Sequence, residues 1–142
     1  MTQEGKLLLL KDLCARLPYG VKFLRESWNY EWDQETSVIE VLEDIDKDGY
    51  INNTKVYTIE DIKPYLRSLS SMTEEEKHKL LKFGAITCLK NGEVIDVSCV
   101  GFERHADVQD YLNTCHFDYR GLIEKGLAIE VTNENNPYKS HE

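Results

Sequence analysis

The spacing of apolar residues predicts an amphipathic helix at the start of the chain, over residues 2–17. Thr2 is placed to cap this helix, and Pro18 is placed to end it, because proline disfavours α geometry at the residue before it. The expected buried stripe consists of Leu7, Leu10, Cys14 and Leu17, widened by Leu9 and Leu13.

Shorter apolar runs follow, and they predict strands. Residues 21–25 fit one strand; residues 37–45 fit a strand or a helix, and their β-branched content favours the strand. A type I turn over residues 46–49, with Gly49 in the left-handed position, would then pair Asp46 with Tyr50. That register places Ile45 opposite Ile51 and Ile39 opposite Tyr57. Residues 56–59 would continue the hairpin, and Pro64 would close the lobe.

Between these strands, Trp28, Tyr30 and Trp32 alternate with polar residues. Exposed, they would form a recognition surface; half-buried, they would form one face of a strand or an ordered loop. Packing is the favoured interpretation, since aromatic side chains more often supply core area.

The second half of the chain has clear start and turn signals. Thr73 and Glu76 have capping-box spacing, which predicts a helix from there to about residue 83. Asn91-Gly92 is the preferred pair of a type I′ hairpin turn. In the register that this turn sets, the numbers of paired residues sum to 183. Ile86 is then opposite Val97 and Cys88 is opposite Ile95 on one buried face, with Cys88 and Cys99 as small core residues. A short helix is expected over 106–114, with Val108, Tyr111 and Leu112 inward.

Residues 116–131 are the stretch around which the chain is predicted to be organised. Asp118 can cap a helix, Gly126 can end it in left-handed geometry, and the alternation over 127–131 predicts a closing strand. The resulting fold class is α+β: an N-terminal helix, a small curled, barrel-like antiparallel sheet, and a second lobe of a hairpin and helices. Residues 1–132 are expected to form one domain, with sub-lobes at about 1–69 and 70–132, and residues 133–142 a flexible tail.

The acidic excess is concentrated in one quarter of the chain. Residues 26–61 hold eleven acids and two lysines, which accounts for the whole net charge of −9. Nucleic-acid binding through this segment is excluded, because phosphate contacts need lysine and arginine. No apolar run approaches a membrane span and no signal peptide is recognisable, so cytoplasmic residence and no membrane partner are expected. The four cysteines are expected to be reduced thiols.

The most specific motif lies within the acidic segment. Asp44, Asp46, Asp48 and Gly49 match an EF-hand calcium loop, with Asn52 at an acceptable position. Lys55 stands where the loop requires a bidentate glutamate, and no second loop exists, so an acidic hairpin turn is the favoured interpretation. Asp44, Asp46, Asp48 and Asn52 remain a weak metal candidate.

Other chemistry is sparse. A metal set or a Cys–His dyad could be drawn from Cys88, Cys99, Cys115, His78, His105 and His116, but adjacent residues such as Cys115 and His116 rarely bind one ion together. Asp118 could be a catalytic carboxylate, although capping already accounts for it. No cofactor and no catalytic residue is assigned.

Three blocks of the sequence resemble a family of small proteins from prophages and mobile elements of gut Bacteroidales. They are LLLKDLCARLPYGV at 8–21, KPYLRSLSSMTEEE at 63–76, where the family usually has proline in place of Ser68, and HFDYRGLIEKGLAI at 116–129. The resemblance implies a small accessory protein of phage or mobile-element origin, and it implies no activity, cofactor or catalytic residue.

The sequence therefore predicts a non-enzymatic accessory protein that binds an unknown basic host or phage protein through its acidic segment. The expected contact residues are Glu40, Glu43, Asp44, Asp46 and Asp48. The alternatives are a small enzyme with a site near His116 and Asp118, a single degenerate EF-hand-like calcium binder over 44–55, and an acidic segment that only keeps the protein soluble.

Overall fold

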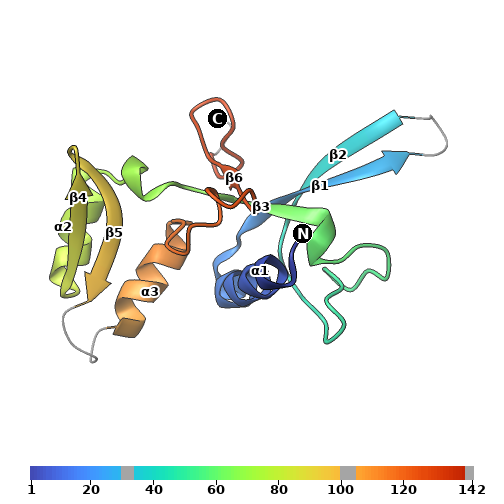
Figure 1. Cartoon of the computed structure of the whole chain (residues 1–142), viewed down its shortest axis with the longest axis horizontal. Helices are drawn as coiled ribbons and strands as arrows, with labels where there is room; N and C mark the ends of the chain where they lie inside the picture. Colours follow the sequence, from blue (N-terminus) through green and yellow to red (C-terminus); the bar gives the residue numbers. More distant parts are fainter. Residues whose placement is uncertain (30–33, 100–104, 140–142) are drawn as a thin grey trace.

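The computed structural model describes residues 1–29, 34–99 and 105–139. Figure 1 shows two lobes, joined where β3 (Ile62–Leu66) runs toward the second lobe. The first lobe holds helix α1 (Gln3–Arg16) and strands β1 (Lys22–Asn29) and β2 (Gln34–Val41). The second holds α2 (Glu74–Lys82), β4 (Ala85–Lys90), β5 (Glu93–Cys99) and α3 (His105–Thr114). The predicted α+β class is confirmed.

The first lobe contains a mixed, open sheet. Its strand order is β2-β1-β3-β6, where β6 is Ile129–Glu130. Strand β1 is antiparallel to both β2 and β3, whereas β3 and β6 are parallel. The four strands do not close on themselves, so the expected barrel-like sheet is replaced by an open one. No helix in the described ranges is long and apolar enough to cross a membrane.

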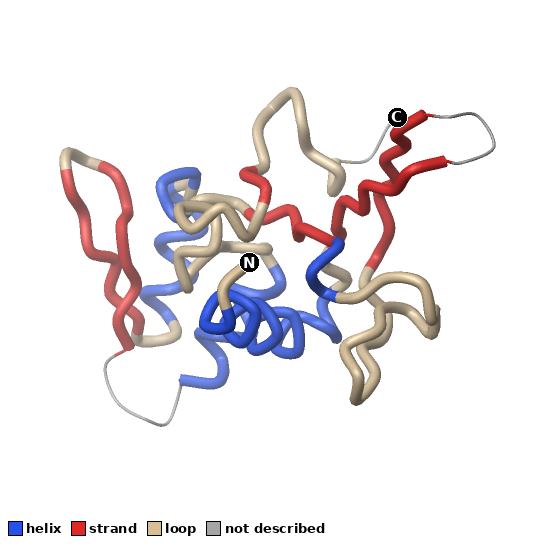
Figure 2. The backbone as a smooth tube through the Cα atoms, turned by 45° about the vertical axis from the view of Figure 1, so that its right-hand side comes forward, coloured by secondary structure: helices blue, strands red, loops and turns tan. Residues whose placement is uncertain are grey.

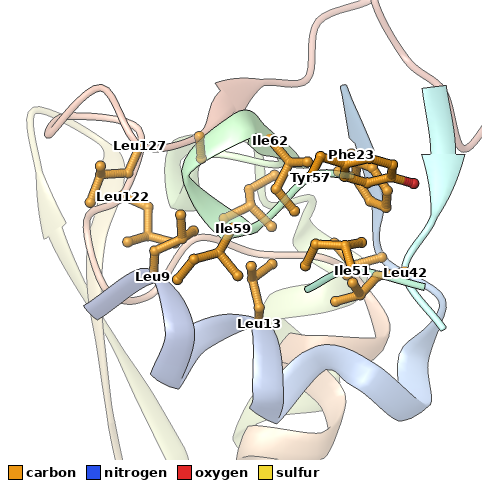
Figure 3. Close-up of a cluster of buried hydrophobic side chains, with 13 residues drawn as sticks. Leu9, Leu13, Phe23, Leu42, Ile51, Tyr57, Ile59, Ile62, Leu122 and Leu127 are labelled. Atoms are coloured by element: carbon orange, nitrogen blue, oxygen red, sulfur yellow. The ribbon is translucent and has the colours of Figure 1, made fainter. Parts of the chain in front are cut away.

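Helix α1 begins and ends where the sequence predicts, with the Thr2 hydroxyl accepting from the Gly5 N–H. Its buried face differs in part from the predicted stripe. Leu9 and Leu13 are fully buried against Ile59 and Leu122 (Figure 3), whereas Leu7 is 57% exposed and Cys14 is exposed. The buried face also carries Asp12 and Arg16, which neutralise each other inside the protein. The prediction is therefore confirmed for Leu9 and Leu13, and Leu10 and Leu17 pack against the same core, whereas Leu7 and Cys14 lie outside the buried face.

Residues 37–41 form a strand, as favoured, but their partner is not the one predicted. Ile45 does face Ile51 across the 46–49 turn, and Gly49 has φ +87° as expected. Ile39, however, pairs with Leu24 of β1 and not with Tyr57. Strand β1 offers β2 eight consecutive partners, whereas the hairpin beyond residue 51 is broken by two residues in left-handed geometry, Asn52 and Asn53.

The chain after this turn also departs from the prediction. Thr58 caps a short 3₁₀ turn over Ile59–Asp61, where a continued strand was expected. Pro64 lies inside β3 and pairs with Phe23, so it does not close the lobe. Side-chain packing of Trp28, and everything concerning Tyr30 and Trp32, lies outside the described part of the structure.

The second lobe follows the sequence closely until the hairpin register shifts. The capping box of Thr73 and Glu76 is present, and α2 and α3 form as predicted. Next to the Asn91-Gly92 turn the predicted register holds, but beyond it Cys88 pairs with Asp96. One extra residue, Ile95, is thereby accommodated in β5, and every pair further from the turn changes partner.

The predicted burial of the hairpin holds for Val97 and Cys99, which pack against the apolar cluster of this lobe, and is wrong for the two isoleucines. Ile86 and Ile95, expected in the core, are 52% and 56% exposed, while Ala85 and Val94 are buried. Cys88 and Cys99 are half-buried, and only Cys99 packs against the apolar cluster of this lobe. A bulge inserts one extra residue into one strand of a pair. The turn residues that set the register do not indicate whether such a bulge follows.

The stretch 116–131 is central, but it is not a helix. The Asp118 carboxylate accepts from the N–H groups of Leu122 and Ile123, at 2.9 Å each, so it caps backbone N–H groups of a turn, where a helix cap was predicted. Gly121 has φ +74°, so the chain leaves the helical path before a second turn can form. Gly126 has φ +73° as expected, and the closing strand is only the two residues of β6.

The C-terminal segment is docked onto the first lobe at Pro137 and Tyr138. The Tyr138 hydroxyl donates to the Tyr65 carbonyl at 2.6 Å and accepts from the Lys22 N–H at 2.9 Å. Lys22 Nζ also donates to the Pro137 carbonyl at 2.8 Å. Residues 137 and 138 therefore belong to the packed body, although the sequence assigns them to a loose tail.

Candidate functional site

Glu40, the first of the predicted contact residues, is engaged within its own lobe. It lies on β2, where its carboxylate accepts from the Tyr57 hydroxyl at 2.7 Å and lies 3.5 Å from the Arg25 guanidinium. Burial, followed by the hydrogen bond to Glu40, raises the pKa of Tyr57. The Glu40 carboxylate therefore holds Tyr57 and Arg25 in place, and it is less available to bind a partner protein.

Asp46 organises the turn that follows Ile45. Its Oδ1 accepts from the N–H groups of Asp48 and Tyr50 at 2.9 Å, and Lys55 Nζ lies 3.9 Å from its Oδ2. The Tyr50 N–H is the main cause that lowers the pKa of Asp46. The side chain is thus a turn-forming group of the kind for which aspartate is favoured.

Asn52 has a similar structural role. Its Oδ1 accepts from the N–H groups of Glu43 and Asp44, at 2.8 and 3.1 Å, and its Nδ2 donates to the Val41 carbonyl at 2.8 Å. The amide oxygen that an EF-hand would turn toward calcium is used by the backbone here. No group of three or more His, Cys, Asp or Glu within the described ranges is arranged to hold a metal ion.

The predicted contact residues therefore divide into structural and available groups. Glu40 and Asp46 stabilise the lobe, Asp44 is half-buried, and Glu43 and Asp48 are exposed. We call residues 43–48 the acidic loop. It continues directly from β2, so Glu43 and Asp48 present their charge close to the end of that strand.

The four side chains from His116 to Arg120 that could have formed an enzyme site do not converge. Asp118 is occupied by backbone N–H groups, and the Tyr119 hydroxyl donates to Asn113 Oδ1 at 2.8 Å. Arg120 Nη1 donates both to Asp12 Oδ1 at 3.0 Å and to the Tyr119 hydroxyl at 3.1 Å, so Tyr119 and Arg120 contact each other. His116 lines a separate cavity, so the four side chains do not meet in one space in which a substrate atom could react.

That cavity has a volume of about 740 Å³ and lies where the C-terminal segment meets the start of the second lobe. Its polar lining includes Arg67, Cys115 and His116, together with Ser68, Ser70, Ser71, Asn133, Asn136, Tyr138 and Lys139. The Arg67 guanidinium is already paired, since it forms bidentate hydrogen bonds to the Glu76 carboxylate at 2.7 and 2.8 Å. Its pKa is raised chiefly by that pair.

His116 is the unusual group in the cavity. It has φ +62°, its ring stacks on Tyr138 at 3.8 Å, and its Nδ1 is buried with no hydrogen-bond partner in the described structure. Burial is the main cause that lowers the pKa of His116 to about 4, and the charges of Arg16, Arg67 and Lys22 add to it. The imidazole is therefore neutral at pH 7.

The neighbouring cysteine is not activated. Burial raises the pKa of the Cys115 thiol, so the thiolate that a nucleophile requires is disfavoured. The other candidate metal ligands do not form a cluster. None of the four cysteines is in a disulfide, and His78 and His105 are exposed. The cavity holds polar groups without an arrangement for proton transfer or covalent chemistry.

Sequence reasoning missed a buried ionic network that fixes the centre of the molecule. Arg16 Nε donates to Asp12 Oδ2 at 2.7 Å, and Arg16 Nη2 donates to the Phe117 carbonyl at 2.6 Å. Both side chains are fully buried, and Arg120 adds a second cation to Asp12. The signal was present: Leu9, Asp12, Leu13 and Arg16 recur at helical spacing on one face of α1.

The three sequence blocks that carry the family resemblance meet around Phe117. Arg16 comes from the first block, and Arg67, from the second, lies 4.3 Å from the Phe117 ring centre. The backbone of Arg67 also donates to the His116 carbonyl and accepts from the Asp118 N–H, at 2.8 Å each. The blocks thus form the junction between the two lobes.

Comparison with known proteins adds no further assignment: the sequence matches no protein-family model, no curated protein and no solved structure.

Proposed function

We propose that this protein is a non-enzymatic accessory protein of phage or mobile-element origin that binds a basic protein partner through its acidic loop. The observation that carries the proposal is the exposure of Glu43 and Asp48 on a loop whose shape is held by Asp46 and Asn52. A fixed loop presents its charges without a large ordering cost on binding. Cytoplasmic residence belongs to the same proposal.

The charge distribution supports a basic partner. Eleven acids within residues 26–61 repel one another, and the two lysines of the segment cannot balance them. A positive partner surface would relieve this repulsion, speed the encounter and set specificity. A nucleic-acid-binding protein whose own DNA surface is basic has the required chemistry.

The experiment is a pull-down from bacterial host lysate with the wild type and the double variant Glu43→Lys/Asp48→Lys. Asp46 is left unchanged, because its replacement would disturb the turn. The matched control is Glu124→Lys/Glu134→Lys, which changes the charge equally at exposed positions away from the acidic loop.

We expect the wild type and the control to retain the same basic proteins at low salt, and the Glu43/Asp48 variant to lose them. Retention should also fall as salt rises, since exposed charges are screened within about 10 Å at 0.1 M ionic strength. If all three proteins capture the same set, the acidic loop only aids solubility and the proposal fails.

A small-molecule site in the His116 cavity is the second candidate. It is favoured by the unpartnered, buried Nδ1 of His116, which a polar ligand could satisfy. A thermal-shift screen of polar metabolites would test it. A stabilising compound should lose its effect in His116→Asn, a replacement that tolerates the positive φ of this position; equal stabilisation of both proteins would exclude the cavity as the binding site.

A further inference from the structure

Strand β2 is an edge strand of the open sheet. It pairs with β1 through eight consecutive residue pairs and has no second strand neighbour among the described residues. Figure 2 shows the β1–β2 hairpin extending away from the helices. An uncovered edge of this length presents a row of backbone groups to which another extended chain can pair.

The register identifies which groups point outward. The Leu42 N–H donates to the Val21 carbonyl at 2.8 Å, and no bulge interrupts the pairs from Val41 to Gln34. Hydrogen-bonded and non-bonded pairs alternate along an antiparallel ladder. The N–H and C=O groups of Ser37, Ile39 and Val41 therefore point away from β1.

An independent contact supports this assignment. The Val41 carbonyl accepts from Asn52 Nδ2 at 2.8 Å, so it faces away from β1 and toward the acidic loop. Asn52 ends the free edge at this carbonyl. Among the described residues, the backbone of Ser37 and Ile39 and the N–H of Val41 have no further strand partner, and an incoming strand can pair with them.

The side chains of β2 are compatible with the addition of another strand at this edge. Val38, Ile39 and Val41 are 38%, 49% and 38% exposed, an unusual display of β-branched apolar residues on a free edge. Proteins ordinarily protect such edges with lysine, proline or a bulge. Residues 37–41 contain neither lysine nor proline, and their pairing with β1 is regular.

We propose that the outer edge of β2 receives an extended, basic segment of the partner protein as a fifth strand of the sheet. The inference rests on the proposed function, because the acidic loop continues from this strand and selects the charge of the incoming segment. A second copy of this chain is the less favourable occupant, since it would place two copies of the acidic segment 26–61, each with a net charge of −9, against one another.

The test uses a defined probe, a peptide of about nine residues that alternates lysine and valine, matching an ordinary strand length. Two control peptides accompany it: one alternates glutamate and valine, and one carries N-methyl groups that block backbone pairing. Amide hydrogen exchange is followed by NMR at Ser37, Ile39 and Val41, with Val38, which is paired to β1, as the internal reference.

A matched pair of variants separates backbone pairing from charge attraction. Ser37→Pro removes one outward N–H from an exposed edge position, where proline is tolerated, and Ser37→Ala keeps that N–H. We expect the lysine–valine peptide to slow exchange at the three outward amides and to bind Ser37→Pro about five- to tenfold more weakly than Ser37→Ala, about the value of one net hydrogen bond. Neither control peptide should protect these amides.

The remaining outcomes overturn the inference. Peptide binding that depends on Glu43 and Asp48 but leaves the outward amides unprotected would preserve the proposed function and exclude strand addition. Protection that grows with protein concentration in the absence of peptide would identify a second copy as the occupant. No peptide binding, together with lysate capture that depends on the acidic loop, would again exclude strand addition alone.

Discussion

Asp12 and Arg16 are the residues on which the centre of the molecule depends most directly. They are fully buried at 2.7 Å from each other, and Arg16 also holds the Phe117 carbonyl. A buried pair of this kind adds little net stability compared with apolar residues of the same volume, because both charges are removed from water. Removing one partner is costly, since the other is left uncompensated.

We therefore expect Asp12→Ala to lower the free energy of unfolding by about 3–5 kcal/mol, measured by urea denaturation. The double variant Asp12→Ala/Arg16→Met should recover part of this loss, because it removes the unpaired guanidinium. A loss in Asp12→Ala below about 1 kcal/mol, the scale of an exposed ion pair, would contradict the network described here.

His116 makes stability depend on pH. Its pKa is about 4 in the folded protein, below the ordinary value of 6.5. Between these values the unfolded chain binds a proton that the folded protein does not, so the free energy of unfolding falls as pH decreases from 6.5 toward 4. Above pH 6.5 the imidazole is neutral in both states and has no effect.

The measurement is urea denaturation at several pH values, with His116→Asn as the comparison. We expect the variant to lose less stability than the wild type between pH 6.5 and 4.5, because it has no imidazole at this position to protonate. Parallel curves would show that other groups cause the pH dependence.

At the scale of elements, loop 44–55 has the sequence of a calcium-binding motif, but its side chains stabilise the backbone of the loop. Its carboxylate and amide oxygens are turned toward backbone N–H groups, and Lys55 lies beside Asp46. We expect millimolar calcium to leave the melting temperature nearly unchanged. A site with a micromolar dissociation constant would add about 4 kcal/mol at a thousandfold excess of calcium, a shift of roughly 10 °C.

Magnesium at the same concentration is the control for general ionic effects. A shift specific to calcium and abolished by Asp48→Ala would show that the loop rearranges to bind the ion. Asp48 is the suitable position because its side chain is exposed, whereas replacing Asp46 would also remove the turn.

At the scale of the whole molecule, the net charge of −9 is the dominant electrostatic property. Repulsion among the acids of residues 26–61 opposes the compact state, and salt screens it. The melting temperature should therefore rise as sodium chloride increases from about 10 to 500 mM, over which the screening length shortens several-fold.

The variant Glu43→Gln/Asp48→Asn tests the source of this effect, because it removes two exposed charges and retains similar side-chain shapes. It should melt higher than the wild type at low salt and gain less from added salt. An unchanged salt response in this variant would place the repulsion elsewhere on the surface.

The sequence by itself determined the features that depend on neighbouring residues. The helices at 3–16, 74–82 and 105–114, the turn at Gly49 and the hairpin turn at Asn91 all follow from caps, periodicity and left-handed positions. Each is decided within about one turn of backbone, so a single sequence contains the necessary information.

Only the tertiary structure decided which faces are buried and which strands pair. The buried face of α1 depends on Asp12 finding Arg16 and Arg120, one of them more than a hundred residues away, and a count of apolar residues cannot supply that partner. Strand β2 pairs with β1 because β1 offers a longer continuous ladder than the local turn, and the β4–β5 hairpin, whose register shifts by one residue, exposes Ile86 and Ile95. Long-range partners and single-residue register shifts carry no local signal, since their free energy comes from contacts that exist only after folding.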